Sequence, residues 1–245
     1  MRVIGRSRGY QEAAELVEEG LVLHREASNT RGVAWSVCSL ANTSSELGDY
    51  ARSKVLFEEG IALARKMGGA LPLANLLMAL GYEYLLEGDH ERATALSEEA
   101  AELYRKRGSR GGLKYALYIL GWAALLREDH ERARALLEEN LVLCNEIGAK
   151  VIGSLSAEGL ACSAVSRGEA KRAAWLFGVA ATLREAVGYH EPPRERALGE
   201  PYLDAARSML SEAEWEVAFA EGKTLSPSRR RRLHRLPWVI GPQNL

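Results

Sequence analysis

Histidines are the side chains in this 245-residue sequence that first suggest metal chemistry. His90 and His130 take the same place in a repeated Asp-His-Glu-Arg-Ala string, 40 residues apart. A metal site needs ligands that converge on one coordination sphere, whereas stacked repeats hold equivalent side chains in separate turns. His24 and His190 have no cysteine or paired carboxylate at ligand spacing. We therefore expect His90 and His130 to pack in turns, and we expect no metal site.

Acidic pairs and a glycine-rich stretch could support acid–base or phosphate chemistry. Glu98-Glu99 and Glu138-Glu139 recur at the same 40-residue spacing. Acid–base catalysis needs two carboxylates in unlike environments, and a periodic series places them in like ones. A solvated convex surface is the better interpretation. The stretch from Gly108 to Lys114 lacks the spacing of a phosphate-binding loop and the Ser or Thr that follows it. The sequence thus predicts no catalytic residue, no cofactor and no enzyme activity.

The composition indicates a helical protein of the cytoplasm. Alanine, leucine, glutamate and arginine dominate, whereas proline and β-branched residues are scarce, which favours an all-α fold. Three cysteines (Cys38, Cys144, Cys162) are scattered without metal-like or redox spacing, which favours a reducing compartment. The N-terminal stretch has no apolar signal-peptide core. The longest uncharged run, Gly68 to Tyr82, is too short to cross a bilayer.

Two short sequence motifs recur every 40 residues, and they must set the positions of all these side chains. The first opens with a glycine or glutamate followed by an acid (Gly48-Asp49, Gly88-Asp89, Glu128-Asp129, Gly168-Glu169), and the second is a glycine (Gly68, Gly108, Gly148, Gly188). One amphipathic stretch lies between each of these motifs and the next. A fixed period of this size is typical of a solenoid of helix pairs. The acids suit helix N-caps, and the period-closing glycines suit a left-handed backbone after a helix.

The period divides the chain into units. A half repeat covers residues 8–28, with a helix at 9–26, and full repeats cover about 30–68, 70–108, 110–148 and 150–188. His190-Glu191-Pro192-Pro193 then breaks the pattern. Two closing helices are predicted within residues 189–222, from Arg194 to Leu210 and, after a Ser211-x-x-Glu214 capping box, through Glu221.

The ends of the chain carry two further expectations. The half repeat lacks its first helix, so an apolar face should need cover from preceding protein, or should pair with a second copy. Residues 223–245 hold six Lys/Arg and no acid, which leaves 26 basic against 33 acidic side chains, a net −7, in the rest of the chain. The Arg229–Arg235 run has no recognition helix. A flexible solvated tail is therefore favoured over nucleic-acid binding.

The repeat units resemble the tetratricopeptide (TPR) family. The second unit carries Leu77-x-x-Leu80-Gly81-x-x-Tyr84 and then Ala93 and Ala100; the third carries Leu117-x-x-Leu120-Gly121 and Ala133; the fourth carries Leu160, Ala173, Phe177 and Ala180. The resemblance implies a right-handed superhelix, an α-solenoid of helix hairpins. Two departures are the 40-residue period, against about 34 in the family, and glycine in place of the closing proline. Such longer repeats are similar to those of MalT-type and LuxR-type ATP-dependent regulators.

A sharper resemblance covers about residues 170–226. Its motifs are Ala173-Ala174-Trp175-Leu176-Phe177-Gly178, Leu183 to Ala186, Pro192 to Arg196, and Trp215 to Gly222 with Leu225-Ser226. They look like the C-terminal portion of predicted bacterial signal-transduction ATPases that are fused to LuxR-type or similar DNA-binding domains. The resemblance implies a regulatory part without its own ATP site. The basic tail departs from this pattern, which leaves its role open.

By the geometry of the TPR family, the first helix of each pair lines a concave groove. The inward side chains with recognition chemistry are Trp35, Asn42, Asn75, Met78, Tyr82, Tyr115, Tyr118, Trp122 and Glu158. Aromatic rings with polar handles suit binding surfaces, and the alternative is that they pack the interior of a tight superhelix. The resemblance implies a non-catalytic interaction or effector-sensing module that binds a protein, peptide or small effector. The other interpretation is a free-standing adaptor.

Overall fold

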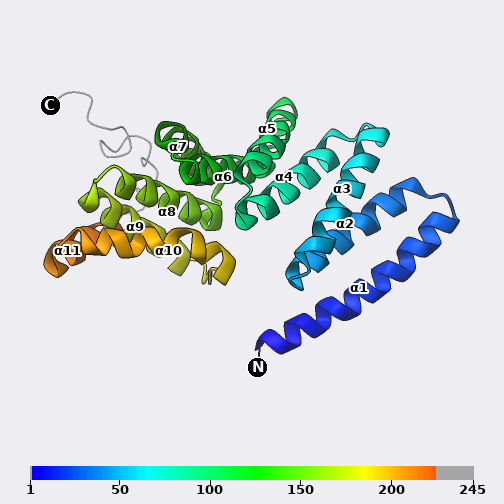
Figure 1. Ribbon diagram of the computed structural model, residues 1–245, viewed down its shortest axis with the longest axis horizontal. Coiled ribbons are helices and arrows are strands. Elements are labelled where there is room, and N and C mark those ends of the chain that lie inside the picture. Colours follow the sequence, from blue (N-terminus) through cyan, green and yellow to red (C-terminus); the bar gives the residue numbers. More distant parts are fainter. Residues whose placement is uncertain (1, 225–245) are drawn as a thin grey trace.

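The computed structural model describes residues 2–224, and in this part of the chain the fold is all-helical, with eleven helices and no strand (Figure 1). The helices are α1 (Arg2–Glu26), α2 (Thr30–Glu46), α3 (Tyr50–Met67), α4 (Ala70–Glu87), α5 (His90–Lys106), α6 (Arg110–Leu126), α7 (His130–Ile147), α8 (Lys150–Ser166), α9 (Ala170–Glu185), α10 (Pro193–Ser208) and α11 (Glu212–Lys223). The predictions for residues 225–245, including the Arg229–Arg235 run, lie outside the described residues. None of the described helices combines the length and apolar character that a membrane span requires.

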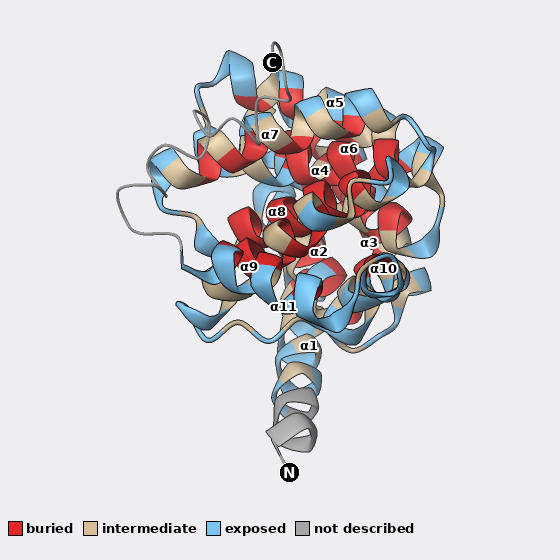
Figure 2. Ribbon diagram, turned by 90° about the vertical axis from the view of Figure 1, so that its left-hand side faces the viewer, coloured by how far each residue is buried: buried red, intermediate tan, exposed pale blue. Residues whose placement is uncertain are grey.

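Successive helices pack against each other from α1 to α9, as a series of hairpins. The first helices of neighbouring hairpins also touch, α4 against α6 and α6 against α8. Figure 2 shows that the buried residues concentrate on these inner helices. On α8, every residue from Ile152 to Ala164 is buried. The inner helices therefore form the spine of the molecule, and the second helices cover it.

The turns repeat as the sequence predicts. The side chains of Asp49, Asp89 and Asp129 accept hydrogen bonds from the backbone N–H three residues later, which caps α3, α5 and α7. A residue with positive φ follows each of α1 to α9 within three positions, at 20-residue intervals from Ser28 (51°) to Gly188 (61°). Glycine reaches this backbone without strain. The predicted left-handed role of the period-closing glycines is thus confirmed.

Glu128 breaks the glycine pattern at one of these corners, with φ at 63°. Because a left-handed backbone strains any residue with a Cβ, Glu128→Gly is expected to stabilise the protein by roughly 0.5–1 kcal/mol. Thermal unfolding followed by circular dichroism measures this change. The equivalent Gly88 (φ 92°) provides the control. Gly88→Ala is expected to destabilise, and two shifts of the same sign would contradict the argument.

Small residues let the paired helices approach closely. A Cβ on Gly81 of α4 would lie 2.6 Å from the Ser97 hydroxyl oxygen of α5. One on Gly121 of α6 would lie 2.6 Å from Leu137 of α7. Ala93 and Ala133, on the facing helices, are fully buried. Each crossing therefore depends on one residue without a side chain and one with only a methyl group.

The glutamates of the second helices take part in ion pairs between neighbouring repeats. An arginine near the end of one second helix reaches a glutamate of the next in three successive steps: Arg25–Glu59 (2.7 Å), Arg65–Glu99 (2.9 Å) and Arg105–Glu139 (3.0 Å). A second series runs in the opposite direction through Arg52–Glu18, Arg132–Glu98 and Arg172–Glu138. Sequence analysis identified these glutamates only as solvated. The equal 40-residue spacing of arginines and glutamates was the signal that could have shown the pairing.

α1 begins at Arg2, earlier than the predicted start at residue 9, because no proline interrupts the helix in between. Its outer face carries exposed Leu16 (69%) and Leu23 (64%). The leucines 40 residues further on, Leu56 and Leu63, are half-buried against the first hairpins. Within the described residues, α1 therefore exposes apolar side chains whose equivalents in the next repeat are partly buried.

The two closing helices lie close to their predicted positions. Ser211 and Glu214 form the expected capping box at α11, and Pro201 sits inside α10 without ending it. α11 packs on α9 with the two backbones in contact, since a Cβ on Gly222 would lie 2.0 Å from the Trp175 carbonyl oxygen. α10 instead reaches across to α8 and α4. The chain therefore returns to the middle of the array after its last repeat.

Candidate binding groove

The nine predicted groove residues lie at equivalent positions of α2, α4, α6 and α8, but they divide into two groups by exposure. Trp35 (63% exposed), Asn42, Asn75 and Tyr115 are exposed, and Met78 is half-buried. Tyr82 is half-buried, whereas Tyr118, Trp122 and Glu158 are buried. We call the first group the open half of the groove and the second the covered half.

Residues 189–199, the loop before α10 and its first turns, contact the covered half; we name them the closing segment. The hydroxyl groups of Tyr82 on α4 and Tyr189 in the loop both donate hydrogen bonds to the Glu195 carboxylate. Arg194 donates to Glu83 Oε2 at 3.1 Å. Its guanidinium also lies 3.5 Å from the centre of the Tyr50 ring. Two neighbouring residues of α10 therefore contact α3 and α4, more than 100 residues earlier in the chain.

Acidic side chains gather at the other end of the closing segment. Glu158 on α8 pairs with Arg184 of α9, whose other guanidinium nitrogen lies 3.4 Å from Glu191. Burial, together with the nearby Glu191, raises the pKa of Glu158 to about 7, against the opposing effect of Arg184. Burial also raises the pKa of Glu191. A Cβ on Gly199 would lie 2.6 Å from Glu158 Oε1. α10 therefore passes directly over this carboxylate.

The aromatic residues of the covered half form a continuous row. The ring centres of Tyr82 and Tyr118 are 6.4 Å apart, and those of Tyr118 and Trp122 are 6.5 Å apart. Such spacings are those of interacting aromatic pairs. Tyr118 and Trp122 are only 3% and 2% exposed. Tyr118, Trp122 and Glu158 are therefore packed in the protein interior rather than in an open groove, and Gly199 of α10 lies against Glu158.

The open half keeps its polar groups near solvent. Asn42 donates to the Cys38 carbonyl at 2.8 Å, and Asn75 accepts from the Tyr104 hydroxyl at 2.7 Å. Lys114 lies 4.1 Å from the centre of the Tyr115 ring. Trp35 exposes most of its indole. This part of the face combines a large apolar surface with amide groups, which is the composition of many recognition surfaces.

Four residues that take part in the contacts around the covered half were not predicted from the sequence: Glu83, Tyr189, Arg194 and Glu195. Glu83 is 4% exposed and also accepts a hydrogen bond from the Ser45 hydroxyl. The other three lie outside the 40-residue period, so the repeat pattern carries no information about their position. The density of ionisable residues around Pro192-Pro193 was the available signal.

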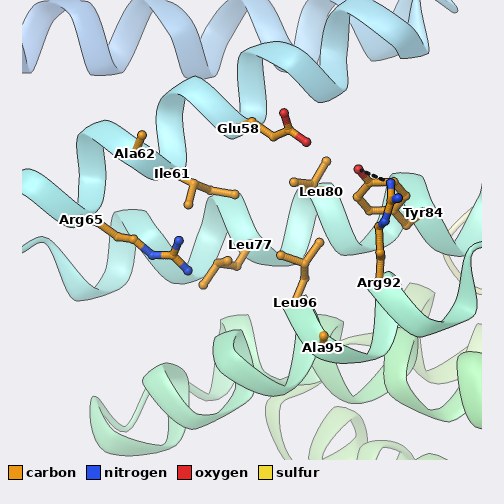
Figure 3. Close-up of a pocket in the computed structure, with 10 residues that line it drawn as sticks. All are labelled: Glu58, Ile61, Ala62, Arg65, Leu77, Leu80, Tyr84, Arg92, Ala95 and Leu96. Atoms are coloured by element: carbon orange, nitrogen blue, oxygen red, sulfur yellow. Dashed lines mark hydrogen bonds between the residues drawn. The ribbon is translucent and has the colours of Figure 1, made fainter.

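A second hollow, of about 610 Å³, lies between α3, α4 and α5 (Figure 3). Its apolar lining includes Ile61, Leu77 and Leu80. Of the polar groups at its edge, Arg65 pairs with Glu99, and Arg92 lies over the Tyr84 ring and donates to its hydroxyl at 3.3 Å. These arginines are occupied by neighbouring side chains. The hollow thus offers apolar surface but no unpaired arginine to direct a ligand.

The candidate metal and acid–base residues remain apart. His90 and His130 are the first residues of α5 and α7, and the Nδ1 atom of each is buried without a hydrogen-bond partner in the described part of the chain. Burial lowers the pKa of His90. Within residues 2–224, no three His, Cys, Asp or Glu side chains are arranged so that they could hold a metal ion.

Comparisons with known proteins identify the fold only. No family model and no curated protein matches this sequence. Among solved structures, the chain is similar to BtubC (BKLC) from P. vanneervenii, with a TM-score of 0.60 and 14% sequence identity. The match covers 96% of this chain and 93% of that one. The similarity therefore extends over nearly the whole of both chains, at an identity that supports shared architecture alone.

Proposed function

We propose that the array is a TPR-like right-handed superhelix and that it acts as a non-catalytic binding module. The TPR assignment is supported by the hairpin period, the left-handed corners and the close helix crossings at Gly81 and Gly121. The observation that carries the function is the face of α2, α4, α6 and α8 on which the predicted groove residues lie. It already holds one polypeptide segment through side-chain hydrogen bonds, and beside it Trp35 and Asn75 are exposed.

The partner that suits the open half is a peptide or protein segment. Exposed tryptophan and tyrosine provide anchoring area, and the nearby amides provide hydrogen bonds that set direction. A small effector with an apolar ring and polar groups uses the same chemistry. The face joins Trp35 and Asn42 of one hairpin to Asn75 of the next. An extended segment that spans two hairpins therefore fits it best.

We further propose that this module is the regulatory part of a LuxR-like or MalT-like ATP-dependent transcriptional regulator of the cytoplasm. This assignment depends on the resemblance of residues 170–226. An ATPase or DNA-binding domain encoded in the same reading frame would support it. A reading frame without either would favour the free-standing adaptor.

The binding function is tested by selecting peptides from a displayed library on the immobilised full chain. Peptides that bind the open half are expected to lose about tenfold or more in affinity against a Trp35→Ala/Asn42→Ala variant. Both side chains are exposed, so the melting temperature should change little.

Val217→Ala is the matched control, because Val217 is also exposed (62%) but lies on α11. It is expected to leave the affinity of the selected peptides unchanged. Failure to select any peptide, or equal binding to the double variant and the control, would refute the proposed function.

A further inference from the structure

We infer that the closing segment is an internal ligand of the concave face, and that the covered half accepts an external partner of the same chemistry, a helix that begins with an Arg-Glu pair after a proline turn. This inference rests on the proposed function and names a partner class for the covered half. The external partner and the closing segment then compete for the same surface, the covered half.

The contacts of the closing segment are polar and paired residue by residue. Glu195 accepts hydrogen bonds from Tyr82 of the face and Tyr189 of the loop, and Arg194 reaches Glu83 and Tyr50. Arg194 and Glu195 are adjacent in the closing segment. The residues of α4 that they contact, Glu83 and Tyr82, are also adjacent. This adjacent matching fixes both the direction and the register of the segment.

Packing alone does not explain these contacts. A buried carboxylate such as Glu83, 4% exposed, carries a large desolvation penalty, and an apolar pair would fill the same space at least as favourably. Buried ion pairs provide selectivity for one particular arrangement. The face is thus built to recognise the Arg-Glu pair and not only to cover apolar surface.

α10 is attached in a way that permits exchange. Of its sixteen residues only Gly199 and Ala206 are buried, whereas α11 buries Trp215 and packs its backbone on α9. Segments with few buried apolar contacts open at lower free energy than the core. α10 is therefore held between two firmly anchored helices by its polar contacts and by the half-buried Leu198, Tyr202 and Leu203. Its release exposes the covered half without dismantling the array.

The experiment measures binding of a fluorescein-labelled peptide of residues 187–204 to the full chain by fluorescence anisotropy. In the wild type the tethered segment competes at high effective concentration. The chain variant Arg194→Ala/Glu195→Ala weakens this competitor and keeps Tyr50, Tyr82 and Glu83 intact. The variant is expected to bind the peptide at least about tenfold more tightly than the wild type. A peptide that itself carries Arg194→Ala/Glu195→Ala is expected to bind neither chain.

Equal affinity of the variant and the wild type, or equal binding of the two peptides, would overturn the inference. Hydrogen exchange of the wild-type chain gives a second test that needs no variant. α10 amides are expected to exchange faster than those of α9 and α11, and equal protection would also overturn it. If displayed peptides bind through Trp35 while the 187–204 peptide does not bind, the proposed function stands and only this inference fails.

Discussion

Gly222→Ala is expected to destabilise the protein by about 3 kcal/mol or more and to detach α11 from α9. The added Cβ would lie 2.0 Å from the Trp175 carbonyl oxygen and 3.1 Å from the Gly178 Cα atom. Both are backbone atoms, so no side-chain rotation can relieve the overlap. The helices must separate, and Trp215, now 3% exposed and stacked on Phe219, loses its packing against Phe177.

Urea unfolding measures this loss, and near-ultraviolet circular dichroism reports the environment of Trp215. Gly178→Ala should behave similarly, because its Cβ would lie 2.2 Å from the Phe219 carbonyl oxygen. Gly20→Ala is the matched control: Gly20 is also helical, but no atom lies within 4 Å of its added Cβ. It is expected to be neutral or stabilising by up to about 1 kcal/mol. A small effect at Gly222 would show that α11 does not pack on α9 in this way.

The attachment of the closing segment is expected to weaken as pH rises from about 4.5 to about 7. Burial raises the pKa of Glu158 from 4.5 to about 7, so the folded state binds a proton that the unfolded state has released in this range. Stability therefore falls with rising pH, and is highest below pH 4.5 as far as this group is concerned. A pKa difference of this size corresponds to a change of about 3 kcal/mol in the free energy of unfolding.

Burial decides the sign of the pKa shift of Glu158, and the charged groups around it modify the shift. Arg184 of α9 favours its ionised form, and Glu191 opposes it. Glu195 and the Tyr118 and Tyr189 hydroxyl groups add no positive charge. Arg184 faces both Glu158 and Glu191, and Arg196 also acts on Glu191. A proton on Glu158 reduces the repulsion between the two carboxylates. As pH rises, the closing segment is the part that must respond, because Glu191 and Glu195 belong to it.

Hydrogen exchange of α10 at pH 5 and pH 8, corrected for the intrinsic rate, measures the change. Protection is expected to be lower at pH 8. Glu158→Gln replaces the titrating carboxyl with an amide of the same shape and should remove most of the dependence. Protection that rises with pH, or an undiminished dependence in Glu158→Gln, would be incompatible with this account.

The repeat architecture could be predicted from the residues because it is locally encoded. Asp49, Asp89 and Asp129 cap their own helices through hydrogen bonds to residues three positions away. Gly48 and its equivalents adopt a backbone that depends on the residue itself. The helix boundaries follow from the same signals, and small residues at fixed spacing specify the close crossings. Each of these features involves residues within one repeat.

The tertiary structure alone decided which of the predicted groove residues are exposed. The contacts of Arg194 with Glu83 and of Glu195 with Tyr82 join residues 111 and 113 positions apart, outside any period. The repeat pattern identifies Tyr118 and Trp122 as inward-facing but does not show that both are buried. A repeat pattern predicts which side chains of each unit face the neighbouring units. Where a non-repeating segment settles depends on the sum of distant polar contacts, which exists only once the array has formed.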